Sequence, residues 1–243
     1  MTPAPPGPVA LDEDLHVHST WSDDAVSSVA ENLAAAARRG LTRIRLVEHV
    51  RRSTPWLPDF ALALAGEARP AGVEVVSGVE AKILDASGAL DLPDDLAGVD
   101  AVVVADHRFP GPDGPWSPRE TRERLASGLG VGEALDLLVD ALVAAMTTAR
   151  GRRPAQLAHC FSILPKVGLG EHDLTDDQLA RWAEAAARTG TAVEVNEKWA
   201  CPGPRALGVA RDAGAALVAS SDSHRHDDVG RYDRVRSLVA DLP

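Results

Sequence analysis

Histidines at the ends of apolar segments are the residues of this sequence with the clearest capacity for chemistry. The chain has 8 histidines among 243 residues. Imidazole nitrogens bind divalent metal ions or carry protons near neutral pH, and carboxylates commonly share such ions. Glu80 and Asp222 end two further apolar segments. The histidines placed in this way are His16, His18, His49, His107, His159 and His224.

The spacing of four of these residues strengthens the case for one site. His16 and His18 are two residues apart, as are Asp222 and His224. On a β-strand, residues i and i+2 project from the same face. A mixed set of imidazoles and carboxylates suits Zn²⁺, Mn²⁺ or Fe²⁺, and only 2 cysteines are present to ligate an iron–sulfur cluster. The pattern therefore predicts a site for divalent metal ions.

Strand-like and helix-like segments alternate along the chain and must position these residues. Alternation of this kind predicts parallel strands joined by helices, with all the carboxyl ends of the strands at one edge. Seven such strands favour a closed (β/α) barrel with its site at that edge. The predicted strands cover 9–18, 43–49, 73–80, 101–107, 155–159, 192–196 and 216–222. The predicted helices cover 26–39, 59–69, 131–149, 175–189, 204–213 and a segment from about 227.

Composition indicates a single domain over residues 9–243, preceded by a flexible, Pro-rich leader at 1–8. The Pro- and Gly-rich stretch 108–118 is predicted to be an irregular surface loop. No segment approaches the ~18 apolar residues of a membrane span, and the first ten residues do not read as a signal peptide. We therefore expect a cytoplasmic protein with no membrane partner.

The charge balance restricts the partners. With 25 Lys and Arg against 36 Asp and Glu, the net charge is −11 at pH 7. Proteins that bind long nucleic acids present a basic surface, so the balance excludes such a partner but allows a small anionic substrate.

Six motifs that occur in order along the chain resemble the PHP superfamily of metal-dependent phosphoesterases, and most closely its histidinol-phosphatase-like members. The motifs are DLHVHSTWSDD (14–24), LVEHV (46–50), GVEAK (78–82), ADHRF (105–109), LAHCF (157–161) and SSDSHRHDDVG (220–230). The resemblance implies a distorted, seven-stranded TIM-like barrel with two or three divalent ions, and three are favoured because every ligand position is filled.

The resemblance also implies how the ligands divide among the ions. The first ion would take His16, His18, Glu80 and Asp222. The second would share Glu80 and add His107 and His159. The third would take Asp23, His49 and His224, although Asp24 stands where the family often has glycine, so that either aspartate could serve.

Two further departures from the family pattern concern residues beside the ligands. Glu48 replaces the usual aspartate, and we expect it to orient His49. Cys160 replaces a proline, and we expect it to pack as a small apolar residue.

The resemblance implies a phosphatase that hydrolyses a small phosphate monoester through a metal-bridging hydroxide, with Glu80, Asp222 and His224 at the reacting centre. L-histidinol phosphate, and hence histidine biosynthesis, is the best single guess for the substrate. Cations in the loops after strands would bind its phosphate. These cations are Lys82, Lys198, Arg225 and Arg108.

Other interpretations remain open. The alternatives are a nucleotide or oligonucleotide phosphoesterase, a metal-dependent amidohydrolase, and a non-catalytic metal-binding barrel with a regulatory role. Four tryptophans that follow strands either wall a pocket for a flat leaving group or anchor the loops. They are Trp21, Trp56, Trp116 and Trp199.

Overall fold

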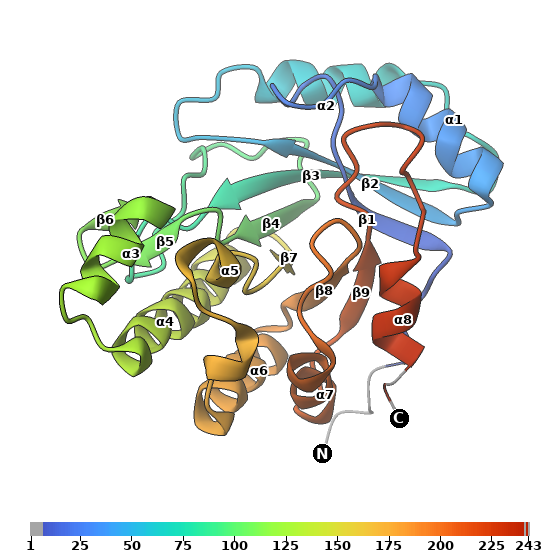
Figure 1. The fold of residues 1–243 in the computed structure, drawn as a ribbon. Coiled ribbons are helices and arrows are strands. Elements are labelled where there is room, and N and C mark those ends of the chain that lie inside the picture. Colours follow the sequence, from blue (N-terminus) through green and yellow to red (C-terminus); the bar gives the residue numbers. More distant parts are fainter. Residues whose placement is uncertain (1–6, 241, 243) are drawn as a thin grey trace.

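Seven parallel strands form one curved sheet in the computed structural model of the chain (Figure 1). The structure describes residues 7–240 and 242. The strands lie in the sheet in chain order, β1-β2-β3-β4-β7-β8-β9. They are β1 (Glu13–Val17), β2 (Arg43–His49), β3 (Glu74–Lys82), β4 (Ala101–Ala105), β7 (Ala155–Ala158), β8 (Ala192–Asn196) and β9 (Leu217–Ser220).

The sheet closes at the carboxyl ends of its first and last strands. Val17 forms a parallel bridge with Ser223, and the His18 amide donates to the Ser223 carbonyl at 2.9 Å. β1 and β9 are neighbours, and the bridge that closes the sheet between them lies just beyond the end of β9. The predicted seven-stranded, distorted barrel in a single domain is thus confirmed.

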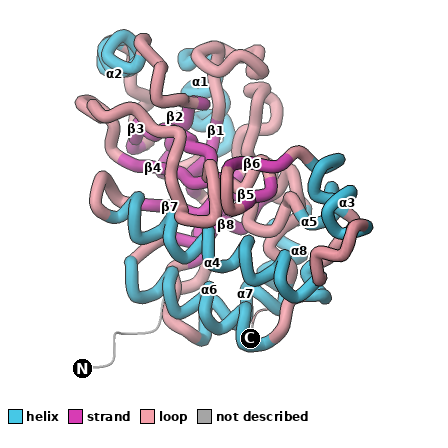
Figure 2. Tube along the Cα trace, turned by 90° about the vertical axis from the view of Figure 1, so that its left-hand side faces the viewer, coloured by secondary structure: helices cyan, strands magenta, loops and turns pink. Residues whose placement is uncertain are grey.

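Helices cover the outside of the sheet, as the tube view shows for α4, α6 and α7 (Figure 2). The helix α1 illustrates why the boundaries fall where they do. The Ser28 hydroxyl accepts from the Glu31 amide at its start, and Gly40 ends it with a φ of 70°. The helices are α1 (Val29–Arg39), α2 (Leu57–Gly66), α3 (Pro118–Ala126), α4 (Val131–Arg150), α5 (Leu164–Val167), α6 (Asp176–Thr189), α7 (Pro204–Asp212) and α8 (Arg234–Ala240), with a 3₁₀ turn at Glu171–Asp173.

The two faces of the sheet bury different side chains. Ile44 and Leu46 of β2 belong to the large apolar cluster between sheet and helices. Val47, on the opposite face of that strand, belongs to a small cluster with Val103, Ala105 and Ala158. The interior of the barrel therefore contains few apolar groups, which leaves room there for polar side chains.

The stretch 108–118 is not irregular, and that prediction was wrong. It contains an antiparallel hairpin of β5 (Phe109–Gly111) and β6 (Gly114–Trp116). Stacked rings of Phe109 and Trp116, with centroids 5.8 Å apart, hold the two strands together. A two-stranded ribbon tolerates proline because each strand has a free edge. The periodicity of the sequence did not predict α3, α5 or the 3₁₀ turn.

The predicted leader falls mostly on residues 1–6, which lie outside the described part of the chain. Within the described ranges, no helix combines the length and the apolar character that crossing a membrane requires.

Candidate metal centre

The carboxyl ends of the strands bring the predicted ligands together. β2 ends at His49, β3 carries Glu80 near its end, and Asp222 follows β9. His107 comes two residues after the end of β4, and His159 directly follows the end of β7. Three overlapping groups could each hold an ion, with ligand atoms that all lie within 4.8 Å of one another. They are His18, His49 and His224; His16, His18 and Asp222; and His49, Glu80 and His107.

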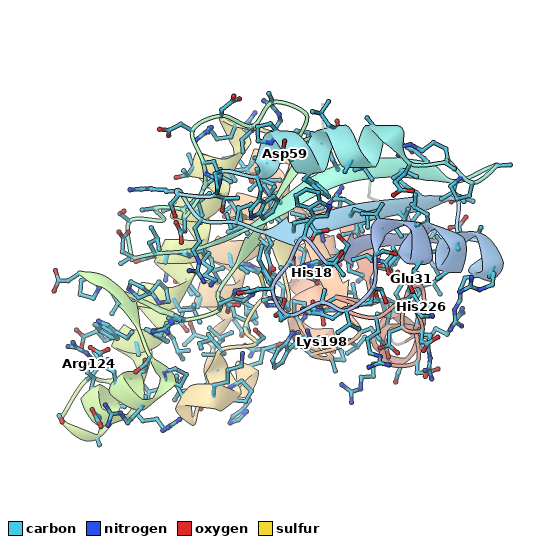
Figure 3. The ribbon with its side chains drawn as sticks, turned by 90° about the horizontal axis from the view of Figure 1, so that it is seen from above. His18, Glu31, Asp59, Arg124, Lys198 and His226 are labelled. Carbon is cyan, nitrogen blue, oxygen red and sulfur yellow. The ribbon has the colours of Figure 1, made fainter. Side chains whose placement is uncertain are left out.

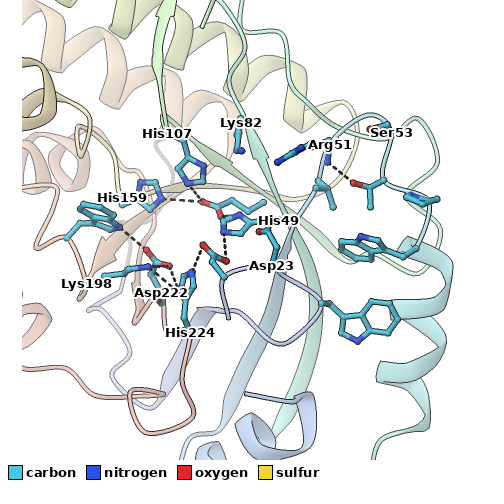
Figure 4. A pocket seen from close by; sticks show the side chains of 18 residues that line it. Asp23, His49, Arg51, Ser53, Lys82, His107, His159, Lys198, Asp222 and His224 are labelled. Carbon is cyan, nitrogen blue, oxygen red and sulfur yellow. Dashed lines mark hydrogen bonds and ion pairs between the residues drawn. The ribbon is translucent and has the colours of Figure 1, made fainter. Parts of the chain in front are cut away.

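Glu80 lies at the centre of the cluster and is almost fully buried. Its Oε1 lies 3.0 Å from His107 Nε2 and 3.2 Å from His159 Nε2. Its Oε2 lies 2.8 Å from His49 Nδ1 (Figure 4). Burial alone would raise the pKa of Glu80, but the surrounding imidazoles, led by His107 and His16, hold it well below its usual value. A carboxylate with both oxygens facing imidazoles from different strands has the position of a bridging ligand.

Glu194 fixes the orientation of the His16 ring. Its Oε2 lies 2.9 Å from His16 Nδ1, and both side chains are fully buried. Glu194 also accepts from Gln156 and Asn196, so its carboxylate is surrounded by donors. His16 must therefore carry hydrogen on Nδ1, so Nε2, which faces the cluster, is the atom that could bind an ion. Burial opposes protonation of His16, but Glu194 and Glu80 raise its pKa well above its usual value.

Ser22 orients the His18 ring in the same manner. The Ser22 hydroxyl donates to Glu48 at 2.6 Å and accepts from the His49 amide at 3.0 Å. It therefore accepts from His18 Nδ1, 3.3 Å away, when Glu48 is ionised. Burial, together with the His16 and His49 imidazoles, lowers the pKa of His18 to about 3, so that the ring is neutral at pH 7. The Nε2 atom of His18 therefore presents a lone pair to the cluster.

The positions of these two Nε2 atoms test whether the site fits a metal ion. The Nε2 atoms of His16 and His18 face each other at 2.9 Å, and each lies 3.7 Å from Glu80 Oε2. Two ring nitrogens at this distance must share either a proton or a metal ion. Glu80 Oε2 and His49 Nδ1 are buried and 2.8 Å apart, but they form no well-aligned hydrogen bond. Imidazole nitrogens and carboxylate oxygens that converge in this way fit Zn²⁺, Mn²⁺ or Fe²⁺.

His159 and Asp222 complete the buried part of the centre. His159 Nδ1 faces Ser162 Oγ at 3.1 Å and Asp106 at 3.7 Å. Burial opposes protonation of His159, but Asp106 and Glu80 raise its pKa to about 10. Asp222 Oδ1 lies 3.4 Å from His18 Nε2, and its Oδ2 accepts from the Trp199 indole at 2.9 Å. Both His159 and Asp222 have positive φ angles, of 30° and 53°, a costly backbone conformation that is concentrated at functional sites.

Asp24, rather than Asp23, approaches the histidines of the predicted third site. The Asp24 carboxylate lies 3.4 Å from His49 Nε2 and 3.4 Å from His224 Nε2. Partial burial opposes ionisation, but those two imidazoles lower the pKa of Asp24. Asp23 lines the same pocket. The geometry thus favours the second of the two aspartates that the sequence left open.

Two residues that depart from the family pattern, Glu48 and Cys160, lie in different surroundings. Glu48 was expected to orient His49, but its carboxylate binds Ser19 and Ser22, and it reaches the ligands through the Ser22 hydroxyl. Burial raises the pKa of Glu48 to about 7. Cys160 is buried in the apolar cluster, as expected, and burial raises the pKa of its thiol.

The comparisons with known proteins agree with this geometry. Residues 14–198 match the model of the PHP domain. The chain belongs to the PHP domain family. It is 26% identical to a "probable phosphatase" of Caldanaerobacter subterraneus subsp. tengcongensis, over 94% of this chain and 82% of that protein. It is also 26% identical to a "probable phosphatase" of Acetivibrio thermocellus, over 94% and 86%.

A solved structure shares the fold of this PHP domain. The histidinol phosphate phosphatase of Lactococcus lactis, complexed with zinc, L-histidinol and phosphate, superimposes with a TM-score of 0.64. The match covers 95% of this chain and 93% of that one, at 16% sequence identity.

An open pocket of about 510 Å³ gives access to the metal centre of the PHP domain. Two of the predicted substrate-binding cations, Lys82 and Lys198, line it. Arg225 lines a neighbouring pocket, whereas Arg108 is exposed and lines neither. Figure 3, seen from above, shows His18 and Lys198 near the centre of the molecule. The prediction for Arg108 is not supported by its position.

Arg51, which was not predicted from the sequence, also lines this pocket. Arg51 follows the strand-end residue His49 by two positions, as Lys82 follows Glu80, so the same spacing signal could have found it. Figure 4 shows Arg51 and Lys82 on one side of the cluster and Lys198 on another. Among the described residues, neither Arg51 nor Lys82 forms an ion pair with a carboxylate.

The four tryptophans divide between the two roles that the sequence left open. Trp21 and Trp56 line the pocket with ring centroids 5.5 Å apart, and Phe60 packs against both. Trp199 lines the pocket beside Asp222. Trp116 is buried in the hairpin, so it anchors a loop.

Proposed function

We propose that this PHP domain is a metal-dependent phosphatase that hydrolyses small phosphate monoesters. The observation that carries the proposal is the convergence of Nε2 of His16 and Nε2 of His18 on Glu80, at the base of a pocket with unpaired cations. The names of its relatives support the same activity. A pocket of about 510 Å³ accommodates a small ester and excludes a folded polymer.

We assign the ligands to three ions. Divalent ions held there would lower the pKa of an attacking water molecule and offset the charge of the phosphoryl oxygens. The first ion would lie among His16, His18, Glu80 and Asp222. The second would lie among Glu80, His107 and His159. The third would lie among His49, His224 and Asp24.

The cations of the pocket would hold the substrate. Arg51 and Lys82 offer unpaired donors to oxygens of the ester, and the planar guanidinium can bind two of them at once. Lys198 is partly committed, because its Nζ lies 3.5 Å from Asp222 Oδ1 and 3.2 Å from His224 Nδ1. We infer that Lys198 stays beside the ligands and that Arg51 and Lys82 select the anionic substrate.

L-histidinol phosphate is the substrate to try first. Its imidazole is a flat group of the kind that Trp21 and Trp56 can bind by stacking. The solved structure with the same fold holds L-histidinol and phosphate, which supports the choice.

A phosphate-release screen tests the activity. The protein loaded with Zn²⁺, Mn²⁺ or Fe²⁺ is given histidinol phosphate, sugar phosphates and nucleotides, and Glu80→Gln serves as the inactive control. We expect release from at least one ester, and at least a 1000-fold loss of kcat/KM in Glu80→Gln. No release with any metal and any ester would refute the activity.

A variant of the aromatic wall tests the substrate. Trp56→Ala should raise KM for histidinol phosphate about 10-fold, the loss of ~1–1.5 kcal/mol of stacking, and leave KM for glycerol phosphate unchanged. An equal rise for both esters would contradict a role of Trp56 in binding the leaving group.

A further inference from the structure

A buried arginine lies inside the barrel, below the metal centre. Arg45 stands on β2 four residues before His49, and alternation along the strand points both side chains to the barrel interior. The Arg45 side chain is buried, and its Nη1 donates to Gln156 Oε1 at 2.7 Å. Gly78 on β3 makes room for it, because a Cβ atom there would lie 2.9 Å from Arg45 Cδ.

Gln156 connects this arginine to the metal centre. Its Nε2 donates to Glu194 Oε2 at 2.6 Å, and that same oxygen lies 2.9 Å from Nδ1 of His16. An arginine can only donate and an ionised carboxylate can only accept, so the glutamine amide must turn its oxygen to Arg45 and its NH₂ group to Glu194. Every group between Arg45 and the ring of His16 therefore has one possible orientation.

Arg45 and Glu194, which Gln156 connects by hydrogen bonds, carry opposite charges. Glu194 is fully buried, and a buried carboxylate without a positive partner is costly. The His16 ring lies directly against Glu194, and the nearby apolar cluster of Val47, Val103, Ala105 and Ala158 offers no further charge. Arg45 is a second positive group, joined to Glu194 by hydrogen bonds through one intervening side chain.

We propose that Arg45 is a positioning residue of the metal centre, which acts through Gln156 and Glu194 to hold the His16 ring with Nε2 facing the ion. The proposal rests on the assignment of His16 as a metal ligand under the proposed function. It assigns a role to an arginine that touches neither ligand nor substrate. Partners that orient a ligating histidine typically contribute 10- to 100-fold to metal affinity or activity.

The test compares metal affinity among matched variants. The zinc-loaded protein is titrated with a chelator of known affinity, and the stepwise dissociation constant of each bound ion is measured together with the melting temperature and kcat/KM. Zinc affinity below means that of the step that weakens when His16 is replaced by alanine. Arg45→Met removes the donor and the charge, and Gln156→Met breaks the connection while both charges remain. Arg45→Lys keeps a cation that can still donate to Gln156. Arg153→Met is the control, because Arg153 donates only to backbone carbonyls, those of Val99, Leu96 and Arg152, away from the site.

We expect Arg45→Met and Gln156→Met to weaken zinc binding about 10- to 100-fold, and Arg45→Lys to restore it to within about 3-fold. Arg153→Met should lower the melting temperature and leave zinc affinity within about 2-fold. If Arg45→Met does not fold, the zinc affinity of Gln156→Met alone tests the proposal.

Three results would overturn the proposal. One is wild-type zinc affinity in Gln156→Met or Arg45→Met, and another is equal weakening in Arg153→Met. The third is a wild-type protein that holds no zinc. Phosphate release reports separately on the proposed function: a protein that hydrolyses no ester yet shows the expected order of zinc affinities would refute the activity and support the role of Arg45.

Discussion

Replacing Ser22 by alanine should weaken the fold and the metal centre together. The Ser22 hydroxyl is buried and has three partners: it donates to Glu48 at 2.6 Å and accepts from the His49 amide at 3.0 Å and from His18 Nδ1 at 3.3 Å. Alanine removes all three contacts and leaves no hydroxyl to hold the His18 ring.

The expected cost follows from these contacts. A hydrogen bond to an ionised carboxylate contributes about 1.5 kcal/mol or more, and an unsatisfied buried amide costs about 1 kcal/mol or more. The long contact with His18 adds roughly 0.5 kcal/mol, for a total of about 3 kcal/mol. For a chain of this size, each kcal/mol lowers the melting temperature by about 2–4 °C, so we expect a fall of roughly 6–12 °C.

The pH dependence of the stability loss in Ser22→Ala shows how much of it comes from the hydrogen bond to Glu48. The pKa of Glu48 is raised from 4.5 to about 7 in the folded protein, so this group destabilises the fold progressively as pH rises from about 4.5 to 7. The hydrogen bond from Ser22 lowers that pKa. Ser22→Ala should therefore be most costly at pH 8, where Glu48 is ionised, and less costly by about 1 kcal/mol at pH 5.

The assay is thermal unfolding of the metal-free protein at both pH values, followed by chelator competition with zinc. Ser53→Ala is the matched control, since Ser53 lines the same pocket but is exposed. The control should unfold within about 1 °C of the wild type, as expected for surface substitutions. A melting temperature within 2 °C of the wild type for Ser22→Ala, or the same loss at pH 5 and pH 8, would refute the reasoning.

Three further predictions follow from particular contacts. Asp24→Asn should lower kcat/KM at least 10-fold and release one metal ion per chain, whereas kcat/KM of Asp23→Asn should stay within about 3-fold of the wild type. Metal analysis and kinetics check this. A larger loss in Asp23→Asn than in Asp24→Asn would indicate that Asp23 binds the third ion. Gly111→Ala would place a Cβ atom 2.1 Å from the Trp116 indole on the partner strand, so it should destabilise the fold by about 1–3 kcal/mol. Gly132→Ala on α4 has open space around it and should not destabilise the fold. Thermal unfolding checks this, and equal melting temperatures of the two variants would contradict the packing argument. Burial raises the pKa of Cys160, so its thiol should resist alkylation by iodoacetamide at pH 8 until the protein is unfolded, and mass spectrometry showing rapid labelling of the native protein would count against the packed position.

Periodicity predicted most of the fold because each parallel strand is an apolar run bounded by turn residues. The seven strands lie where the sequence analysis expected them, and their ends carry the histidines. The hairpin of β5 and β6 was missed because proline and glycine disfavour strands locally. Its stability depends on the stacking of Phe109 on Trp116, a contact between side chains that only the folded hairpin creates.

The ligand types and their order along the chain were readable, because parallel strands bring their carboxyl ends to one edge whatever the details of packing. The sequence could not choose between Asp23 and Asp24, since neighbouring residues in a loop can each reach the same place. Only the tertiary structure decided that Asp24 faces both His49 and His224, because that choice depends on the path of the loop between β1 and α1.

The groups that orient the ligands were hidden from sequence reasoning for a different reason. Arg45, Gln156 and Glu194 alternate with apolar residues in β2, β7 and β8, a pattern usual for strands with one solvated face. Closure of the sheet into a barrel turns that polar face inward, so that these side chains are buried and must satisfy one another. The sequence by itself determined which residues could bind metal, and the closed barrel determined which residues hold them in place.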